Sequence, residues 1–296
     1  MKRIISTLLP VFALGLALTS HGLRATVIAY DSFDYTDDSN LAGLTGGTGW
    51  DATTNVGWTV NSNITSATIQ SGALVLGNGT DSVLTAASTA SNATRYLSSA
   101  YSGDSLFIKY TFSVGAGTTS NADRFYMTLL GSGNGGGWGN LEIGTGVNNS
   151  IASTNAGAVG DNRIAARVEG SSSNRLAASS PNPILDLTSY TVIVEFSKSV
   201  SGATNKYNTL RLWVNPTESD YSSATAKSLT YSTILYSINR INFSLDEVEA
   251  GDVFTVNEVM LATTWADVTA IPEPSTLSLL LGGSALGVVL LNRRRR

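Results

Sequence analysis

Residues 107–112 read Phe-Ile-Lys-Tyr-Thr-Phe, and residues 241–245 read Ile-Asn-Phe-Ser-Leu. In both stretches apolar and polar side chains alternate over most of the length. Successive side chains of a β-strand point to opposite faces of the sheet, so one row enters a core and the other faces water or a second layer. Both stretches therefore predict strands with one buried face.

The same pattern extends over most of the chain between residues 26 and 270. The clearest expected strands are Thr26–Tyr30, Ala73–Leu76, Leu106–Val114, Arg124–Leu130, Ile164–Val168, Thr191–Lys198, Leu210–Asn215, Ile241–Leu245 and Phe254–Ala262. Between them lie stretches rich in Gly, Ser, Thr and Asn, which favour turns and resist helix. Helix is expected only as a turn or two near Thr264–Val268. Many strands without crossover helices predict an all-β fold, an antiparallel β-sandwich or jelly roll forming one domain over residues 26–270.

The residue types that are missing limit the chemistry of this body. The chain has no cysteine and one histidine, His21, which lies in the N-terminal region. The body therefore has no Ser-His-Asp triad, no thiol nucleophile, no disulfide and no typical zinc or copper site. Catalysis would have to use carboxylates, Lys, Tyr or an oxygen-bound cation, as in glycoside hydrolysis or polysaccharide lyase chemistry. We assign no catalytic residue and no cofactor.

The body is acidic. Leaving out the two ends removes seven of the 18 lysines and arginines and one of the 22 acidic residues, so 11 basic and 21 acidic residues remain, a net charge of −10. A surface of this sign repels polyanions, which argues against nucleic acid as a partner.

The N-terminus has the layout of a secretory signal peptide. Lys2 and Arg3 precede an apolar stretch over residues 4–18, and small and polar residues follow as far as Ala25. This layout predicts export, with residues 1–25 removed by cleavage after Ala25. Cleavage after Ser20 and an uncleaved N-terminal anchor are the alternatives.

The last 26 residues read IPEPSTLSLLLGGSALGVVLLNRRRR. A helix over residues 275–291 would be roughly 25 Å long, close to the thickness of the hydrocarbon core of a bilayer. The basic end consists of Arg293, Arg294, Arg295 and Arg296, which should stay on the cytoplasmic side of the membrane. The tail therefore predicts a transmembrane helix that anchors the body.

The order of the elements in this tail resembles a known sorting signal. Pro272, Glu273 and Pro274, then Ser-Thr, a short apolar span and a basic end, resemble the PEP-CTERM signal of exported bacterial proteins, here over residues 271–296. The resemblance implies processing near the Pro-Glu-Pro element by a membrane-embedded exosortase, in species that make extracellular polysaccharide. A plain C-terminal membrane anchor is the alternative.

A second resemblance involves three segments of the body. Residues 30–50, 190–217 and 254–268 resemble exported bacterial jelly-roll domains of the concanavalin A/laminin-G type. The middle segment consists of a long strand, a polar hairpin and a strand that ends Leu-Trp-Val-Asn-Pro. The resemblance implies that the first and last segments of the domain pair, with residues 30–33 near the closing strand. Lectins, glucanases and inert spacers all occur on this fold.

Two local motifs suggest a function but fit a structural explanation better. Residues 131–136 match G-x-G-x-x-G, but a turn and strand follow instead of the helix that a dinucleotide site requires. Asp246, Glu247 and Glu249 lack the spacing of the laminarinase-type glucanases, Glu-x-Asp-x-x-Glu, and indicate a solvated turn.

Structural calcium has two candidate places, and sugar stacking has one candidate tryptophan. Asp34, Asp37 and Asp38 form one acidic patch, and Asp246 and Asp252 flank another loop. Trp213 and Trp265 are expected in a core or seam, whereas Trp138, in a glycine-rich loop, is the best candidate for an exposed platform for sugar rings.

Together these observations predict an exported, non-catalytic protein of the cell surface or extracellular matrix. The membrane holds it through the C-terminal helix before processing, and its partners are the exosortase and extracellular polysaccharide. The alternatives are a carbohydrate-active enzyme on a jelly-roll fold and a structural surface protein without a ligand.

Overall fold

The computed structural model describes residues 26–61, 66–77, 91–116, 124–131, 141–146, 164–168, 175–177, 184–202, 204–223, 225–228, 235–246 and 251–269. These residues form an all-β fold of antiparallel strands in two sheets. The signal peptide expected over residues 1–25 and the tail over residues 271–296, with its sorting and arginine residues, lie outside the described residues.

Among the described residues one sheet has eight strands and the other has seven. The first sheet has the order β13 (Thr225–Ser228), β12 (Thr209–Val214), β11 (Ser189–Ser197), β6 (Ser105–Val114), β15 (Val253–Ala262), β4 (Ala73–Gly77) and β3 (Ser66–Gln70), with β1 (Val27–Asp31) also paired to β15. The second has the order β10 (Arg175–Ala177), β9 (Ile164–Val168), β8 (Leu141–Gly146), β7 (Arg124–Leu130), β14 (Ile238–Asp246), β5 (Ser91–Tyr101) and β2 (Thr59–Val60).

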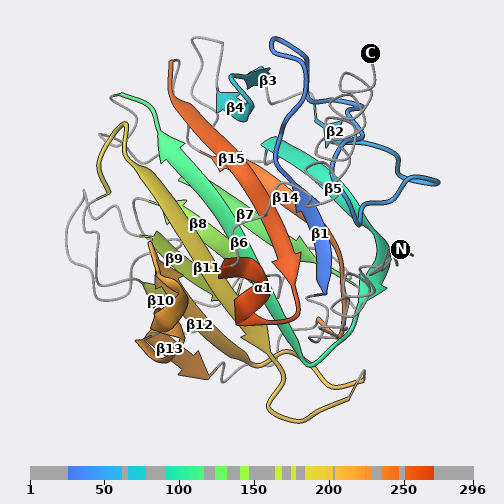
Figure 1. Cartoon of the computed structure of the whole chain (residues 1–296), viewed down its shortest axis with the longest axis vertical. Coiled ribbons are helices and arrows are strands. Elements are labelled where there is room, and N and C mark those ends of the chain that lie inside the picture. The colour runs from blue at the N-terminus through green and yellow to red at the C-terminus, as the bar shows by residue number, and fades with distance from the viewer. Residues whose placement is uncertain are drawn as a thin grey trace, which may run out of the picture.

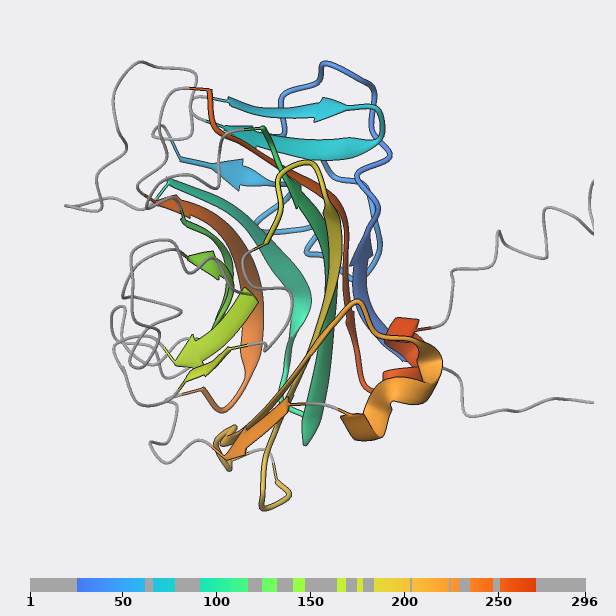
Figure 2. The ribbon, with the colours of Figure 1, turned by 90° about the vertical axis from the view of Figure 1, so that its left-hand side faces the viewer.

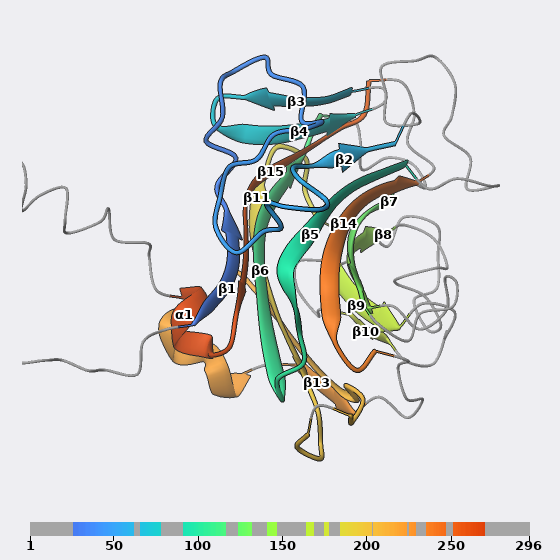
Figure 3. The ribbon, with the colours of Figure 1, turned by 90° about the vertical axis from the view of Figure 1, so that its right-hand side faces the viewer.

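The two sheets lie face to face as two layers (Figures 1 and 2). The seven-stranded sheet is curved, and its concave face points away from the other sheet (Figure 3). Two short helical segments, η2 (Glu218–Ser223) and α1 (Trp265–Thr269), lie on the outer face of the eight-stranded sheet (Figures 2 and 3). Within the described residues no helix is long and apolar enough to cross a membrane.

The alternating side chains build the core between the sheets. Ile108, Tyr110 and Phe112 of β6 face inward and are fully buried, and Phe243 of β14 meets them from the other layer. The rings of Phe125 and Phe243 stack with centroids 6.0 Å apart. All nine expected strands are present, with ends shifted by no more than about three residues, and α1 confirms the short expected helix.

Several strands escaped prediction. β5 has the sequence SNATRYLSSAY, whose serines, threonine and alanines are typical of a loop, yet it is the longest described strand, at 11 residues. β2, β3, β10 and β13 are short strands at or near sheet edges, which local apolar patterns mark weakly.

The closing strand pairs with the first strand, as the jelly-roll resemblance implied. Tyr30 of β1 is the register partner of Met260, and Asp31 is the partner of Val259. The beginning and the end of the body are thus hydrogen-bonded neighbours in one sheet, which explains why the first and last segments both carry strand patterns.

A buried arginine fixes the loop that follows β1. Arg95 of β5 is 1% exposed, and its guanidinium donates hydrogen bonds to the carbonyl oxygens of Leu44 and Gly46. The same group lies 5.6 Å from the ring centroid of Trp50 and 5.7 Å from that of Trp58. An arginine therefore occupies an inward position of β5 because carbonyl oxygens and aromatic faces replace the water that its charge would otherwise need.

The glycines of this loop permit its close approach to β1. Gly49 has a φ of +79°, and a Cβ atom at this position would collide with the carbonyl oxygen of Ile28. Only glycine meets both conditions, which accounts for the Gly-Gly-Thr-Gly-Trp sequence that ends at Trp50.

A second, smaller cluster packs under α1. Trp213 of β12 is buried with Phe107 and Met260, and its ring centroid lies 4.6 Å from that of Trp265. The indole of Trp265 donates to the carbonyl oxygen of Glu218, which ties α1 to η2. Trp213 and Trp265 therefore have the structural roles that the sequence predicts for them.

Candidate functional site

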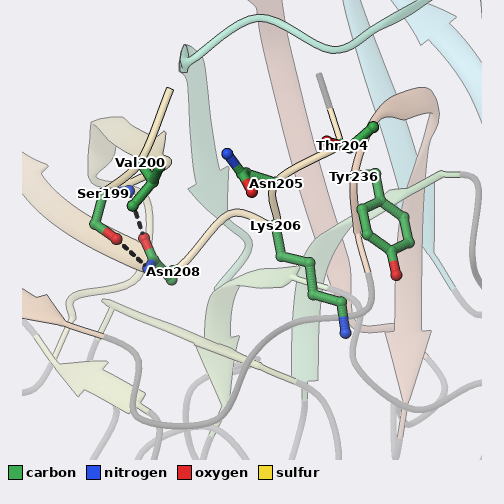
Figure 4. Close-up of a pocket in the computed structure, with 7 residues that line it drawn as sticks. All are labelled: Ser199, Val200, Thr204, Asn205, Lys206, Asn208 and Tyr236. Atoms are coloured by element: carbon green, nitrogen blue, oxygen red, sulfur yellow. Dashed lines mark hydrogen bonds between the residues drawn. The ribbon is translucent and has the colours of Figure 1, made fainter. Parts of the chain in front are cut away.

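A pocket lies at the loop that joins β11 to β12. Its cavity volume is about 420 Å³, within the range of roughly 300–1,000 Å³ that is typical of small-molecule sites. Its lining consists of residues of this loop and one residue from the segment before β14: Ser199, Val200, Thr204, Asn205, Lys206, Asn208 and Tyr236 (Figure 4). Hydroxyl, amide and ammonium groups thus share the pocket with one aromatic ring.

Two buried side chains attach this loop to the body. Lys198 is 8% exposed, and its Nζ donates to the carbonyl oxygens of Ser102, at 2.7 Å, and Gly202, at 3.2 Å. The Nζ atom also lies 4.8 Å from the ring centroid of Tyr207, whose hydroxyl donates to the carbonyl oxygen of Gly103 at 3.0 Å. Burial lowers the pKa of Lys198 and raises the pKa of Tyr207. The base of the loop is therefore fixed to the β5–β6 turn.

An exposed carboxylate holds the tip of the loop. Asp104 accepts hydrogen bonds from the hydroxyl of Ser201 and from the backbone N–H of Gly202, the latter at 2.9 Å. These bonds, the one from Ser201 first, lower the pKa of Asp104. Because a lowered carboxyl pKa stabilises the folded state above the ordinary pKa of Asp and loses that effect as the pH falls through the lowered value, the loop is anchored at neutral pH.

Two asparagines shape the polar wall. Asn208 accepts from the backbone N–H of Ser199 at 2.7 Å and donates from Nδ2 to the Ser199 hydroxyl at 2.5 Å. Asn205 donates from Nδ2 to the carbonyl oxygen of Ser201 at 2.8 Å, and the described residues supply no donor to its Oδ1. The wall is therefore ordered by its own hydrogen bonds and still presents an acceptor.

The opposite side of the pocket is aromatic. Tyr236 is 37% exposed, and the Lys206 Nζ lies 5.5 Å from its ring centroid, with the two side chains side by side (Figure 4). Within the described part of the chain, no carboxylate forms an ion pair with Lys206. An exposed ring beside amides and hydroxyls suits a pyranose, whose C–H face packs on a ring while its hydroxyls form hydrogen bonds.

A row of polar side chains crosses the concave face of the seven-stranded sheet. Thr94 of β5, Asn242 of β14, Thr128 of β7 and Glu142 of β8 are successive register partners. The Oδ1 atom of Asn242 is buried and has no hydrogen-bond partner among the described residues. Tyr236 of the pocket lies two residues before β14, the strand that carries Asn242.

Few of the described side chains on the concave face are carboxylates. Of the described side chains that point outward from β5, β7, β8 and β14, only Glu142 is a carboxylate, whereas glycoside hydrolysis generally requires two. Arg240 lies 5.4 Å from the ring centroid of Tyr96 on the same face.

The acidic patches form no metal site within the described residues, where no group of three or more His, Cys, Asp or Glu side chains could hold an ion. Asp34, Asp37 and Asp38 are exposed instead, and Asp37 accepts weakly from the backbone N–H of Gly72, at 3.4 Å.

Other sequence candidates lie outside the described residues. They are Trp138, Glu247, Glu249, residues 132–136 and the sorting residues Pro272, Glu273 and Pro274. The sequence predicts the polar hairpin but no binding site on it. It predicts no functional role for Tyr236. The available signal was a tyrosine between a leucine and a serine, just before a strand.

No family model matches the chain, and no curated protein matches it. Several solved structures align with this chain at low similarity. The alginate lyase Aly36B has 14% identity and a TM-score of 0.47, over 80% of this chain and 96% of the lyase. The botulinum neurotoxin serotype D binding domain has 10% identity and a TM-score of 0.47, over 82% of this chain and 49% of the other. The Emp46p carbohydrate recognition domain has 13% identity and a TM-score of 0.41, over 78% and 97%. At these values the likenesses carry no weight for function.

Proposed function

We propose that this protein is an exported, non-catalytic component of the cell surface or extracellular matrix that binds neutral polysaccharide at the β11–β12 pocket. The body would be a jelly roll of the concanavalin A/laminin-G type, a proposal supported by the pairing of β1 with β15. One observation carries the binding proposal: the exposed ring of Tyr236, beside Lys206, lines the same pocket as hydroxyl and amide groups that are ordered by their own hydrogen bonds.

Charge favours a neutral ligand. The body between the two termini carries a net charge of −10, which repels anionic polymers at low ionic strength. The pocket contains one charged side chain, Lys206, whose three N–H donors can serve sugar hydroxyls. Binding through stacking and neutral hydrogen bonds should therefore depend weakly on salt.

The test is binding of the chain from Thr26 to Ala270 to two immobilised polymers, the neutral glucan dextran and the uronate polymer polygalacturonate. We expect retention on the neutral polymer, with less than about twofold change between 50 and 500 mM salt, and no retention on the uronate polymer. Retention on the uronate polymer alone, lost at high salt, would contradict the proposal. Retention on neither polymer would favour the structural protein without a ligand.

The enzymatic alternative has its own outcome. Release of reducing ends or of unsaturated sugars from either polymer would make a carbohydrate-active enzyme the better assignment. The single described carboxylate on the concave face, Glu142, argues against glycoside hydrolysis by a pair of carboxylates there.

The proposal of export and sorting is supported by the sequence. The signal peptide over residues 1–25 would direct the body across the membrane, and the helix over residues 275–291 would hold it there. Prolines on both sides of Glu273 restrict the backbone and remove hydrogen-bond donors, so this element suits an extended conformation in a protease cleft.

Replacing Glu273 by alanine should cause the full-length membrane form to accumulate in a host that carries an exosortase, because the element would lose its only charge. Mass spectrometry of the C-terminus measures whether the tail has been removed. Glu218→Ala, at an exposed site of η2, is the matched control. An intact Arg296 on the wild-type surface protein in such a host would show that the tail is a plain membrane anchor and is not processed.

A further inference from the structure

The first described residue of the body lies against its last helix. The backbone N–H of Thr26 donates a hydrogen bond to Oδ2 of Asp267 at 3.2 Å, although the two residues are 241 positions apart. The backbone N–H of Thr263 donates to the carbonyl oxygen of Thr26, also at 3.2 Å. Two independent bonds therefore place the Thr26 nitrogen at the carboxylate of Asp267.

The carboxylate of Asp267 is buried, and its hydrogen bond goes to a residue outside its own helix. Asp267 is only 6% exposed. Thr264, the residue before α1, caps the helix, because its Oγ1 accepts a hydrogen bond from the Asp267 N–H at 3.3 Å. In a complete capping box the acidic side chain returns to the backbone N–H of the capping residue. Here it accepts from Thr26 instead.

No cationic side chain balances this charge within the described residues. The ion pairs of that part of the chain are Lys109–Glu258 and Arg211–Glu195, neither of which involves α1. A buried carboxylate without a positive partner is costly. The geometry therefore provides a place for a positive charge at the Thr26 nitrogen.

We propose that Asp267 is the receptor for the α-ammonium group that signal-peptide removal creates at Thr26. Hydrolysis breaks the Ala25–Thr26 peptide bond: water supplies OH to the Ala25 carbonyl carbon and H to the Thr26 nitrogen. With one more proton from solvent, that nitrogen becomes an ammonium group with three N–H donors. Its ordinary pKa, about 7.7–8.0, keeps it mostly charged at neutral pH. Processing thus converts a neutral, partly buried hydrogen bond into an ion pair with a buried carboxylate.

This receptor also selects between the two cleavage positions that the sequence left open. Cleavage after Ser20 would leave five more residues, so the Thr26 nitrogen would remain a neutral amide. Only cleavage after Ala25 places the charge at Asp267. The unprocessed precursor lacks the ion pair and is the less stable form.

The inference rests on the export part of the proposed function, yet it can be tested without export. Three detergent-solubilised chains that end at Arg296 should begin at Thr26, at Ala25 or at His21. We expect the melting temperature of the Thr26 form to exceed those of the other two by about 3–8 °C. The Ala25 form differs by a single residue, so it separates the position of the charge from the effect of a longer N-terminus.

Asp267→Asn should remove the advantage of the Thr26 form and bring all three chains within about 1 °C of one another. Asp220→Asn, on the adjacent η2, is the matched control and should leave the advantage unchanged. The proposal is overturned if the three wild-type chains melt together, or if the Asp267→Asn chains keep the difference. N-terminal mass spectrometry of the exported protein tests the export part separately: a first residue other than Thr26 would refute processing after Ala25, whatever the melting data show.

Discussion

Replacing Arg95 by alanine should lower the free energy of unfolding by about 3–5 kcal/mol and the melting temperature by roughly 10 °C. The substitution removes the donors to the carbonyl oxygens of Leu44 and Gly46 and the cation above Trp50 and Trp58. It also leaves a cavity at a position that is 1% exposed. The loop between β1 and β2 should then detach from β5.

Chemical denaturation monitored by tryptophan fluorescence measures this effect, because both indoles are at the site. Arg240→Ala is the matched control: Arg240 also lies over an aromatic ring, that of Tyr96, but it is only partly buried, and we expect a loss below about 1 kcal/mol. Arg95→Met keeps most of the side-chain volume and should recover part of the loss. An Arg95→Ala protein as stable as wild type would show that the core does not depend on this residue.

Tyr236→Ala should weaken binding to neutral polysaccharide by at least about tenfold. The ring is 37% exposed at the pocket and is the only aromatic group among its lining residues, so the substitution removes the surface on which a sugar ring would pack. Because the side chain is partly exposed, the fold should survive its loss.

Tyr221→Ala is the matched control, since Tyr221 is 40% exposed on η2 but lies outside the pocket. Affinity electrophoresis in gels that contain the glucan compares both variants with wild type, and circular dichroism verifies their fold. Equal losses in the two variants would argue for nonspecific adsorption, and no loss in Tyr236→Ala would place any binding elsewhere.

Much of the architecture could be predicted because it depends on local pattern. In β6 and β14 the apolar residues recur at every second position, and the buried rings of Tyr110, Phe112 and Phe243 follow that period. The pairing of β1 with β15 could not be derived from such a pattern, because it joins opposite ends of the body; the resemblance to jelly-roll domains supplied it.

β5 shows why other strands escaped prediction. Its inward row is Ala93, Arg95 and Leu97, so an arginine stands where the pattern calls for an apolar residue. The carbonyl oxygens and tryptophans that make this position suitable come from a loop some 40 to 50 residues earlier in the chain. Local sequence cannot reveal such a partner, since tertiary contacts override propensity.

Only the hairpin side of the pocket could be predicted from the sequence. The polar hairpin before β12 was evident as a turn-rich segment between two strands, and Lys206 and Asn208 lie on it. Tyr236 comes from the segment before β14, in the other sheet. The sequence gives no sign that these residues meet, because the meeting depends on how the two sheets are stacked.

The most direct test of the proposed function is a nuclear magnetic resonance titration of the isotope-labelled chain from Thr26 to Ala270 with a neutral gluco-oligosaccharide. We predict saturable shifts confined to residues 199–208 and to Tyr236 and its neighbours, with small changes at the adjoining end of β14. Saturable shifts centred instead on α1 and η2, or no shifts with any neutral oligosaccharide, would contradict the binding of polysaccharide at this pocket.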